Sequence, residues 1–488
     1  MSGKLLGRRR AGVLLHVTSL PGTAHGALGQ AARSFVDWLV AGGFTVWQFL
    51  PLGPVGEDLS PYYARSNHAG DPALVDLATL ADWRLIERAR IGHATHATLR
   101  TLAATRLCGP ACAGGELGKA FAAFLARESY WLADYALFTA LQARESGRPW
   151  WEWPQPLAAR EAAALATART ELGAAIARVE AEQFFFWTQW RTLREYAAER
   201  GVRFLGDLPI YVAPDSVEVW AQRGLFQLDA QGRLEAVAGV PPDYFATDGQ
   251  WWGNPLYRWE EHQRTDFAWW LDRLRAQFEL HDFVRIDHFR GLEAYWAIPA
   301  KATSAAAGSW RVAPGAALLK RARQEFGPLD VVAEDLGVIT PGVEQLRDDF
   351  DLAGMRVAQF GFDGDPDNPH LPHNWRKRLV GYTGTHDNDT SAGWYAALDA
   401  TGRQLVADYL GVPSSQVVPA LVRTVLASSA RLAIAPMQDL LGLGSEARMN
   451  TPATTGGNWS WRFEWPDVPE VLAARCRRWN HLYGRAPR

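Results

Sequence analysis

Several features that would assign a protein to a particular class are scarce in this 488-residue sequence. The three cysteines, Cys108, Cys112 and Cys476, are too few for a disulfide framework, and Cys108-x-x-x-Cys112 lacks the second pair that a zinc site needs. The formal net charge is only -3, so no overall field attracts nucleic acid or an anionic membrane. These absences favour a neutral substrate and a reducing compartment.

Longer sequence signals are absent too. No run of about 18 apolar residues exists, which argues against a transmembrane helix. The apolar stretch from Ala11 to Leu15 is too short for a signal-peptide core, and His16 interrupts it. We find no G-x-x-x-x-G-K-[ST] phosphate loop, no H-E-x-x-H zinc helix and no G-x-S-x-G nucleophile elbow. We therefore expect a cytoplasmic protein with no metal, no cofactor, no nucleic-acid partner and no membrane contact.

Tryptophan, in contrast, is abundant, with 23 residues in a chain whose aromatic share is 12%. We expect most of these side chains to be buried in a core. Some, however, lie beside Gly, Asn and Pro in expected loops, as in Gln250-Trp251-Trp252-Gly253-Asn254-Pro255 and Gly457-Asn458-Trp459. Aromatic rings in loops offer flat apolar surfaces, which suit the faces of sugar rings.

Short apolar or β-branched runs alternate with helical stretches, which is typical of a parallel α/β sheet or barrel. Length alone allows two to four domains or one large barrel. Eight strands can be counted, and eight is the number that closes a barrel. They are expected at Gly12–His16, Thr45–Leu50, Arg203–Leu208, Phe283–Asp287, Val331–Glu334, Met355–Phe360, Val380–Thr385 and Arg431–Met437. The predicted fold is an α/β (β/α)8 TIM-type barrel.

Two long segments interrupt this alternation. The first is rich in Ala, Leu, Glu and Arg at helical spacing, and it predicts a mainly helical insertion at 76–182 between barrel segments 1–75 and 183–488. The second, at about 213–262, is rich in Gly, Pro and Trp, and we expect a long ordered loop with a functional role. Additional loop and helical subdomains should therefore surround the C-terminal mouth of the barrel.

Three carboxylates occur at the ends of predicted strands. Arg285 and Asp287 share one face of their strand, and a nearby guanidinium favours an ionised carboxylate that can act as a nucleophile. The alternative for this pair is a structural ion pair inside the barrel. Glu334 directly follows an apolar strand, and burial there raises the pKa of a carboxyl group so that it can serve as general acid and base.

The third acid, Asp387, follows Thr385 and His386, although an Asp-rich helix cap would give the same local pattern. Parallel barrel strands point their C-terminal ends at one mouth, so the three acids should converge there. Two carboxylates on either side of a bond are what glycosidic cleavage requires. Convergence of three acids is harder to explain as structure alone.

The segments around these acids closely resemble glycoside hydrolase family 77, the 4-α-glucanotransferases called amylomaltases or disproportionating enzymes. The matching stretches span nearly the whole chain. They are LLHVTSLPG at 14–22, WQFLPLGP at 47–54, GDLPIYV at 206–212, GQWWGNPLY at 249–257, RIDHFRGLEAYWAIP at 285–299, NPHLPHNW at 368–375, GTHDND at 384–389 and QDLLGLGSEARMNTP at 438–452.

The resemblance implies a role for each matching residue. It implies that Asp287 is the nucleophile, Glu334 the acid/base and Asp387 the residue that stabilises the distorted sugar. The other residues that it implicates in substrate binding are Arg285, which would orient Asp287; Asp207 and His386, which would bind sugar hydroxyls; Tyr62, which would stack beneath the sugar; and Ser60, Trp252, Asn458 and Phe245, which would line the glucan groove.

Two positions depart from the family pattern. The family commonly has Ser-Pro-Tyr-Gln where this chain has Ser60-Pro61-Tyr62-Tyr63, which replaces an amide by a ring. It commonly has Pro-Gly-Thr where this chain has Pro452-Ala453-Thr454, so a turn that tolerates positive φ is altered. We expect these changes to affect acceptor preference and chain length, while the reaction class stays the same.

The resemblance implies transfer of α-1,4-glucan segments from a maltooligosaccharide, starch or glycogen-type donor to the 4-hydroxyl of a glucan or glucose acceptor. The reaction would be a retaining double displacement through a covalent glycosyl-aspartate. An α-amylase-like hydrolase would share the same barrel and carboxylates. A glucan-binding protein without catalysis is a third alternative, against which the presence of all three acids argues.

Overall fold

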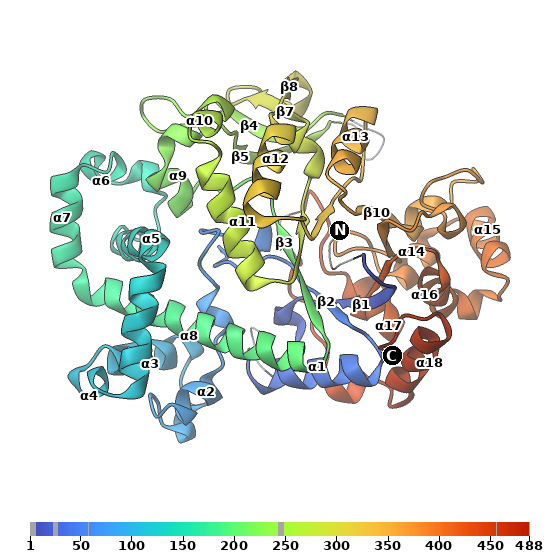
Figure 1. The fold of residues 1–488 in the computed structure, drawn as a ribbon, viewed down its shortest axis with the longest axis horizontal. Coiled ribbons are helices and arrows are strands. Elements are labelled where there is room, and N and C mark those ends of the chain that lie inside the picture. Colours follow the sequence, from blue (N-terminus) through green and yellow to red (C-terminus); the bar gives the residue numbers. More distant parts are fainter. Residues whose placement is uncertain (1–5, 23–27, 57, 243–247, 455, 488) are drawn as a thin grey trace.

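Eight parallel strands form the centre of the molecule in the computed structural model, which describes residues 6–22, 28–56, 58–242, 248–454 and 456–487 (Figure 1). In sheet order, the strands are β10 (Gly354–Val357), β11 (Leu379–Tyr382), β12 (Leu432–Pro436), β1 (Arg10–Leu14), β2 (Val46–Gln48), β3 (Arg203–Leu208), β6 (Phe283–Ile286) and β9 (Val331–Ala333). A bridge between Val332 and Ala353 joins β9 to the start of β10. The sheet therefore closes into a barrel, and all eight predicted strands are confirmed.

The strands are buried on both faces, as expected for a parallel sheet covered by helices. One hydrophobic cluster fills the barrel interior and includes Leu14, Val332 and Ile434. Alternate residues, among them Val284 and Ile286 of β6, belong to the larger cluster outside the barrel. Period-two alternation therefore directs Arg285, which lies between those two residues, towards the barrel interior.

Helices cover the outside of the barrel. They are α1 (Gln30–Ala41), α8 (Gly173–Glu199), α11 (Ala268–Leu280), α12 (Gly315–Phe326), α13 (Pro341–Asp349), α16 (Val417–Ala427) and α18 (Val471–Leu482). The connection from β10 to β11, all of whose residues are described, has only the 3-10 turns η9 (Ala358–Gly361) and η10 (Pro372–Asn374) in place of a helix. The smaller helices α14 (Ser391–Ala397), α15 (Ala400–Leu410) and α17 (Met437–Leu441) flank β11 and β12.

The segment between β2 and β3 is helical, as its composition predicts. It contains α2 (Leu77–Asp82), α3 (His96–Leu107), α4 (Pro110–Ala113), α5 (Glu116–Arg144), α6 (Gln155–Ala158) and α7 (Ala162–Glu171), which lead into α8. These helices project to one side of the barrel, and α8 runs from them along its base (Figure 1). The predicted boundary at 182 falls inside α8, whose 27 residues have no break. The division into the three predicted segments stays a prediction.

The segment at 213–262 is more ordered than a loop. It holds α9 (Val217–Ala221), β4 (Ala236–Val240), β5 (Gln250–Pro255) and α10 (Trp259–Arg264). Strands β4 and β5 join β7 (Ala294–Pro299) and β8 (Ser309–Val312) in an antiparallel sheet of order β5-β4-β7-β8, near the top of the view in Figure 1. Sequence patterning misses this sheet because its Gly- and Trp-rich strands are short and come from two separate parts of the chain.

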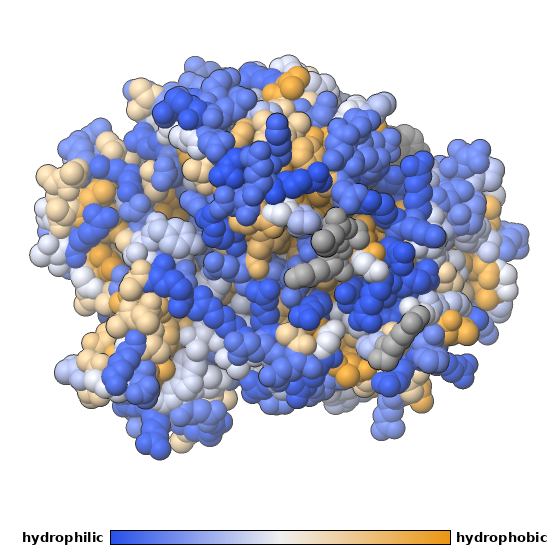
Figure 2. All heavy atoms as spheres, in the orientation of Figure 1, coloured by the Kyte–Doolittle hydropathy of each residue, from blue (hydrophilic) through white to orange (hydrophobic). Residues whose placement is uncertain are grey.

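Polar residues cover most of the face shown in Figure 2, and apolar ones form small separate patches. Among the helices of the described ranges, none is long and apolar enough to cross a membrane alone. One bent pair, Ala400–Leu410 with Ser414–Ala427, passes by length and composition, with an angle of 65° at the break.

Candidate active site

Arg285 connects two carboxylates at the C-terminal end of the barrel. Asp207 on β3 lies directly beside Arg285 on β6 in the strand register, so both side chains point to the same face. The Nη1 atom of Arg285 donates to both Asp207 oxygens at 2.8 and 2.7 Å, and its Nη2 atom lies 2.8 Å from Asp287 Oδ1. The pairing that the sequence suggests between Arg285 and Asp287 is present, and Asp207 completes it on the other side.

Glu334, which follows β9, is held by backbone groups. Its Oε2 accepts the N–H of His288 at 2.7 Å, and its Oε1 accepts the N–H of Leu336 at 2.9 Å. His288 has φ of 50°, a left-handed conformation that is uncommon for a residue other than glycine and that occurs often at functional sites. Gly337, with φ of 79°, makes the turn after Glu334 that its sequence position predicts.

Asp387 occupies the loop after β11. Its Oδ1 accepts a hydrogen bond from the Asn450 amide at 2.6 Å, and its Oδ2 lies 3.3 Å from Nε2 of His386. Arg448 donates to the backbone carbonyl of Asp387 at 2.7 Å. The segment that contains Arg448 and Asn450 therefore fixes both the backbone and the carboxylate of this residue.

Tyr62 links the Asp207 side of the site to the Asp387 side. Its hydroxyl donates to Asp207 Oδ2 at 2.8 Å and also lies 2.8 Å from Nε2 of His386. The Tyr62 and His386 rings are nearly parallel, with centroids 5.3 Å apart, and Trp459 packs against both. Six of the predicted residues thus form one continuous set of contacts: Asp287, Arg285, Asp207, Tyr62, His386 and Asp387.

The electrostatic balance of the site is set by four carboxyl groups around one guanidinium. Burial raises the pKa of Asp287; Arg285 opposes this, while the carboxylates of Asp207, Glu334 and Asp387 add to it. Burial also raises the pKa of Glu334, against Arg285 and the two backbone N–H donors. Arg285 thus favours the ionised Asp287, as expected from the sequence, but burial and the other acids outweigh it.

The remaining predicted residues lie around this centre. The Trp252 ring meets His288, the neighbour of Asp287, edge to face with centroids 4.6 Å apart. Ser60 precedes the 3-10 turn η2 (Pro61–Tyr63) that carries Tyr62. The Asn458 side chain accepts the Thr451 N–H and donates to Thr454, so its hydrogen bonds lie within its own loop. Phe245 lies outside the described residues.

Both departures from the family pattern have structural consequences. The Tyr63 hydroxyl donates to the carbonyl of Trp252 at 3.0 Å, so this ring ties the turn after Ser60 to β5. Ala453 has φ of 63°, in the left-handed region that favours glycine. This position in the turn therefore requires the positive φ that the glycine of the family pattern Pro-Gly-Thr suggests.

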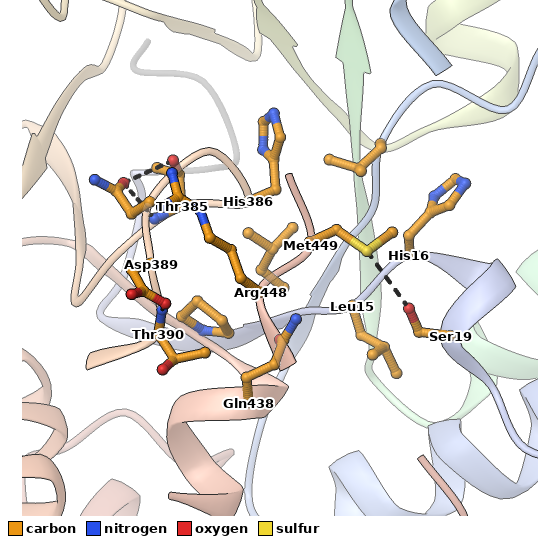
Figure 3. Close-up of a pocket in the computed structure, with 14 residues that line it drawn as sticks. Leu15, His16, Ser19, Thr385, His386, Asp389, Thr390, Gln438, Arg448 and Met449 are labelled. Carbon is orange, nitrogen blue, oxygen red and sulfur yellow. Dashed lines mark hydrogen bonds between the residues drawn. The ribbon is translucent and has the colours of Figure 1, made fainter. Parts of the chain in front are cut away.

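A small cavity of about 20 Å³ lies next to His386 (Figure 3). It is found between the ends of β1 and β12 and the loop after β11. Of the predicted site residues, only His386 is among its lining residues. His16, on the opposite wall in Figure 3, is buried, which lowers its pKa to about 3 and keeps it neutral.

Sequence reasoning missed three contributors to the site. Asn450 and Arg448 position Asp387, and Trp459 packs on Tyr62 and His386. Arg448 and Asn450 lie within the matching stretch at 438–452, and Trp459 lies in the Gly-Asn-Trp loop. Both segments stand out in the sequence, but neither places a carboxylate at the end of a predicted strand, so no role could be assigned to Arg448, Asn450 or Trp459.

Comparisons with known proteins point to one family. Residues 15–467 match the model of glycoside hydrolase family 77, described as 4-alpha-glucanotransferase. A 4-alpha-glucanotransferase of Thermus thermophilus is 47% identical over 96% of this chain and 97% of its own length. One of Synechocystis sp. is 42% identical over 99% of both chains. The amylomaltase of Streptococcus agalactiae, solved in complex with acarbose, superposes with a TM-score of 0.95 at 35% identity, over 98% of this chain and all of that one.

Proposed function

The chain belongs to glycoside hydrolase family 77, the 4-alpha-glucanotransferases, and we propose that it transfers α-1,4-glucan segments by a retaining double displacement. The proposal covers the mechanism and the acceptor, because the family already identifies the enzyme as one that transglycosylates glucans. It also assigns the nucleophile to Asp287, the acid/base to Glu334 and stabilisation of the transition state to Asp387.

The observation that carries the proposal is that the two central acids, Asp287 and Glu334, have different hydrogen-bond and ion-pair partners. Asp287 is paired with a guanidinium at 2.8 Å, whereas Glu334 accepts only backbone N–H groups among its described hydrogen bonds. A neighbouring cation favours the ionised form of Asp287 that a nucleophile needs. Burial raises the pKa of both acids, but only Asp287 has the Arg285 guanidinium in direct contact to oppose it. Glu334 is therefore the better suited of the two to hold the proton that a general acid needs.

In the first step, the Asp287 carboxylate attacks the anomeric carbon of the donor, and Glu334 gives its proton to the departing 4-oxygen. The reducing-end segment of the donor leaves with a free 4-hydroxyl, and the remaining segment stays as an ester on Asp287. In the second step, the 4-hydroxyl of an acceptor attacks that carbon, Glu334 takes the hydroxyl proton, and the ester bond breaks. Two inversions restore the α configuration.

The surroundings of the carboxylates support the acceptance of a sugar in place of water. Tyr62, Trp252 and Trp459 provide aromatic surface around the acids. An acceptor sugar that packs on such surface displaces water from the ester. We propose glucose and maltooligosaccharides as acceptors, in line with the acarbose complex of the Streptococcus relative. We also propose that the enzyme works in the cytoplasm, consistent with its three free cysteines.

Incubation with maltotriose alone tests transfer against hydrolysis. Transfer predicts glucose together with maltopentaose and longer products, with no net gain in reducing ends. Chromatography of the products and a reducing-sugar assay measure both quantities in the same samples. If reducing ends increase and no product exceeds maltotriose in length, the chain is a hydrolase and the proposal is wrong.

A further inference from the structure

Three tryptophans lie in one line across the strands of the small antiparallel sheet. Trp251 on β5 is opposite Gly239 on β4, Gly239 is also opposite Trp296 on β7, and Trp296 is opposite Trp310 on β8. Directly opposite residues of antiparallel strands place their side chains on the same face. The three indoles therefore form a single row across the sheet, which we call the tryptophan row (Trp251, Trp296 and Trp310).

The row is partly open to solvent at both ends. Trp251 is 41% exposed and Trp310 is 40% exposed, whereas the largest buried side chains of the described structure include five other tryptophans. The half-buried Trp296 donates its indole N–H to the carbonyl of Ala305 at 2.8 Å, and its ring centroid lies 5.2 Å from that of Trp310. The fixed central indole therefore supports an exposed neighbour on β8.

Gly239 lies between Trp251 and Trp296, and the buried Ile298 side chain fills the space beside it. A Cβ atom at this position would stand 2.2 Å from the Gln250 carbonyl oxygen and 2.5 Å from Cδ1 of Ile298. Real Cβ contacts are never that short, so a larger residue is excluded here. Glycine therefore lets the apolar Ile298 pack closely between the two indoles, and no side chain of β4 interrupts the row at this position.

Both ends of the row adjoin segments that carry the predicted carboxylates. Trp251 is followed by Trp252, which points to the opposite face and contacts His288 next to Asp287. Since β5 is an edge strand, only this one strand separates the face of Trp252 from the face of Trp251. At the other end, Trp310 packs on the guanidinium of Arg290 at 3.9 Å, and Arg290 donates to a carbonyl in the loop after Glu334.

The size of the row argues against a protein partner. A tryptophan side chain offers roughly 150–250 Å² of surface, so two rings exposed by about 40% offer roughly 60–100 Å² each. Stable protein interfaces bury on the order of 1,000 Å² or more. The three indoles themselves are neutral, and the Arg290 guanidinium packs on one of them, Trp310. A narrow aromatic line fits a chain of sugar rings better than a second protein surface.

We propose that the tryptophan row is an accessory binding surface for the arm of a long α-1,4-glucan that extends beyond the active site. This inference rests on the proposed function, because a polymeric donor must continue past the three carboxylates. The row would hold the arm by stacking and thereby keep a long donor or acceptor near the site. Short substrates such as maltotriose do not reach it.

The test compares Trp251→Ala and Trp310→Ala with the wild type on two substrates, maltotriose alone and linear amylose with glucose as acceptor. The loss of one stacking contact is expected to raise KM for amylose about 3- to 10-fold. For maltotriose, kcat/KM should stay within about 2-fold, since the active site is untouched. Trp251→Phe keeps an aromatic ring and should restore most of the affinity for amylose.

Trp151 provides the matched control, because it is 37% exposed and lies on the 3-10 turn η5 (Trp150–Glu152), outside the sheet. Trp151→Ala should leave both substrates unaffected. Unchanged amylose KM in both row variants overturns the inference, as does an equal loss on both substrates. A shift from dimer to monomer in size-exclusion chromatography of the row variants also overturns it, because a second copy is then the occupant.

Electrophoresis through gels that contain amylose separates this inference from the proposed function. If the wild type fails to elongate maltotriose, the proposed function is wrong. Slower migration of the protein in the amylose gel would still show that it binds a long glucan. Retardation that weakens in Trp251→Ala and not in Trp151→Ala supports the row in either case. Equal retardation of the two variants contradicts it.

Discussion

Glu334 and Asp335 are neighbours in the chain but belong to two different charge networks. Glu334 faces the barrel mouth with Asp207, Arg285 and Asp287, which we call the inner network. Asp335 faces outward and pairs with Arg347 at 2.6 Å and Arg356 at 3.2 Å, and these three residues form the outer network. Asp335 also accepts the N–H of Met355 at 2.6 Å, and its side chain is fully buried.

The ratio of acids to arginines distinguishes the two networks. The outer network surrounds one carboxylate with two guanidinium groups and a backbone donor, so its buried negative charge is fully compensated. The inner network has one guanidinium for three carboxyl groups. Burial raises the pKa of both Asp287 and Glu334, and this single guanidinium does not offset that effect. An excess of buried acid costs stability and is expected where protons must move, whereas matched charge holds elements together.

Exchange of Asp for Asn in each network should give opposite results, and the inner one should show the largest effect on activity. Asp287→Asn removes the proposed nucleophile, so the transfer rate should fall on the order of 10⁴-fold or more. The thermal midpoint should change little, because Arg285 keeps its two hydrogen bonds to Asp207. Product formation from maltotriose and a melting curve measure the two quantities. Residual activity of a few per cent would contradict the nucleophile assignment.

Asp335→Asn should instead reduce stability. The amide removes the buried carboxylate between two largely buried guanidinium groups and leaves Arg347 with only its exposed partners Asp348 and Glu344. Loss of one partner from a buried ion pair typically costs about 3–5 kcal/mol of unfolding free energy. Asp348→Asn is the matched control, since Asp348 binds the same Arg347 at 2.8 Å but its side chain is 57% exposed. Its loss should stay below about 1 kcal/mol. Urea denaturation of both variants makes the comparison, and equal losses would mean that burial does not determine the strength of the outer network.

These networks also mark how far the sequence alone predicts the structure. The strands, the inward direction of Arg285 and Asp287 and the convergence of the acids follow from period-two alternation and from the geometry of a parallel barrel. The outer network does not, because Arg347 and Arg356 come from a helix and the next strand, and their packing on Asp335 depends on tertiary structure. The same reason hides Asn450 from sequence reasoning, which sees no spacing that connects it to Asp387.

The antiparallel sheet shows a second limit. Strand β4 is separated from β7 by more than fifty residues, and its pairing with β7 brings Gly239 opposite Trp296. Composition indicates only an aromatic segment at 213–262. The register that aligns the three tryptophans is a property of backbone pairing between two separate excursions from the barrel, so no local pattern predicts it.

The inner network should respond to pH when one acid is removed. The Glu334 carboxylate is one of the groups that raise the pKa of Asp287. Glu334→Gln removes that negative charge, so Asp287 should ionise at lower pH. The donor for this test is α-maltotriosyl fluoride, whose leaving group needs no proton. In a plot of the rate of glycosyl-enzyme formation against pH, the acidic limb should move to lower pH. Transfer from maltotriose should be slowed far more than reaction of the fluoride.

Asp348→Asn is again a suitable control, because the Asp348 side chain is exposed and belongs to the ion pair with Arg347 on α13, outside the inner network. Its acidic limb should coincide with that of the wild type. A limb that stays in place in Glu334→Gln would mean that the two inner acids do not interact. Equal, mild losses on both donors in Asp287→Asn and Glu334→Gln would overturn the separation of their roles.

The smallest expected effect concerns the backbone beside each network. Asp351, beside Arg378, and Ala453, in the loop that follows Asn450, have the same φ of 63°. Aspartate tolerates this left-handed region, but alanine there costs about 1–2 kcal/mol. Ala453→Gly relieves that strain. Glycine also makes the unfolded chain more flexible, which costs about 0.4–1 kcal/mol of stability, so urea denaturation should show a net stabilisation of roughly 0.5–1 kcal/mol.

Ala166→Gly is the control, at an exposed position inside α7, and it should destabilise the protein by about 1 kcal/mol. Because the same chemical change should act with opposite sign at the two positions, a loss in both variants would show that the loop at 451–459 does not strain Ala453.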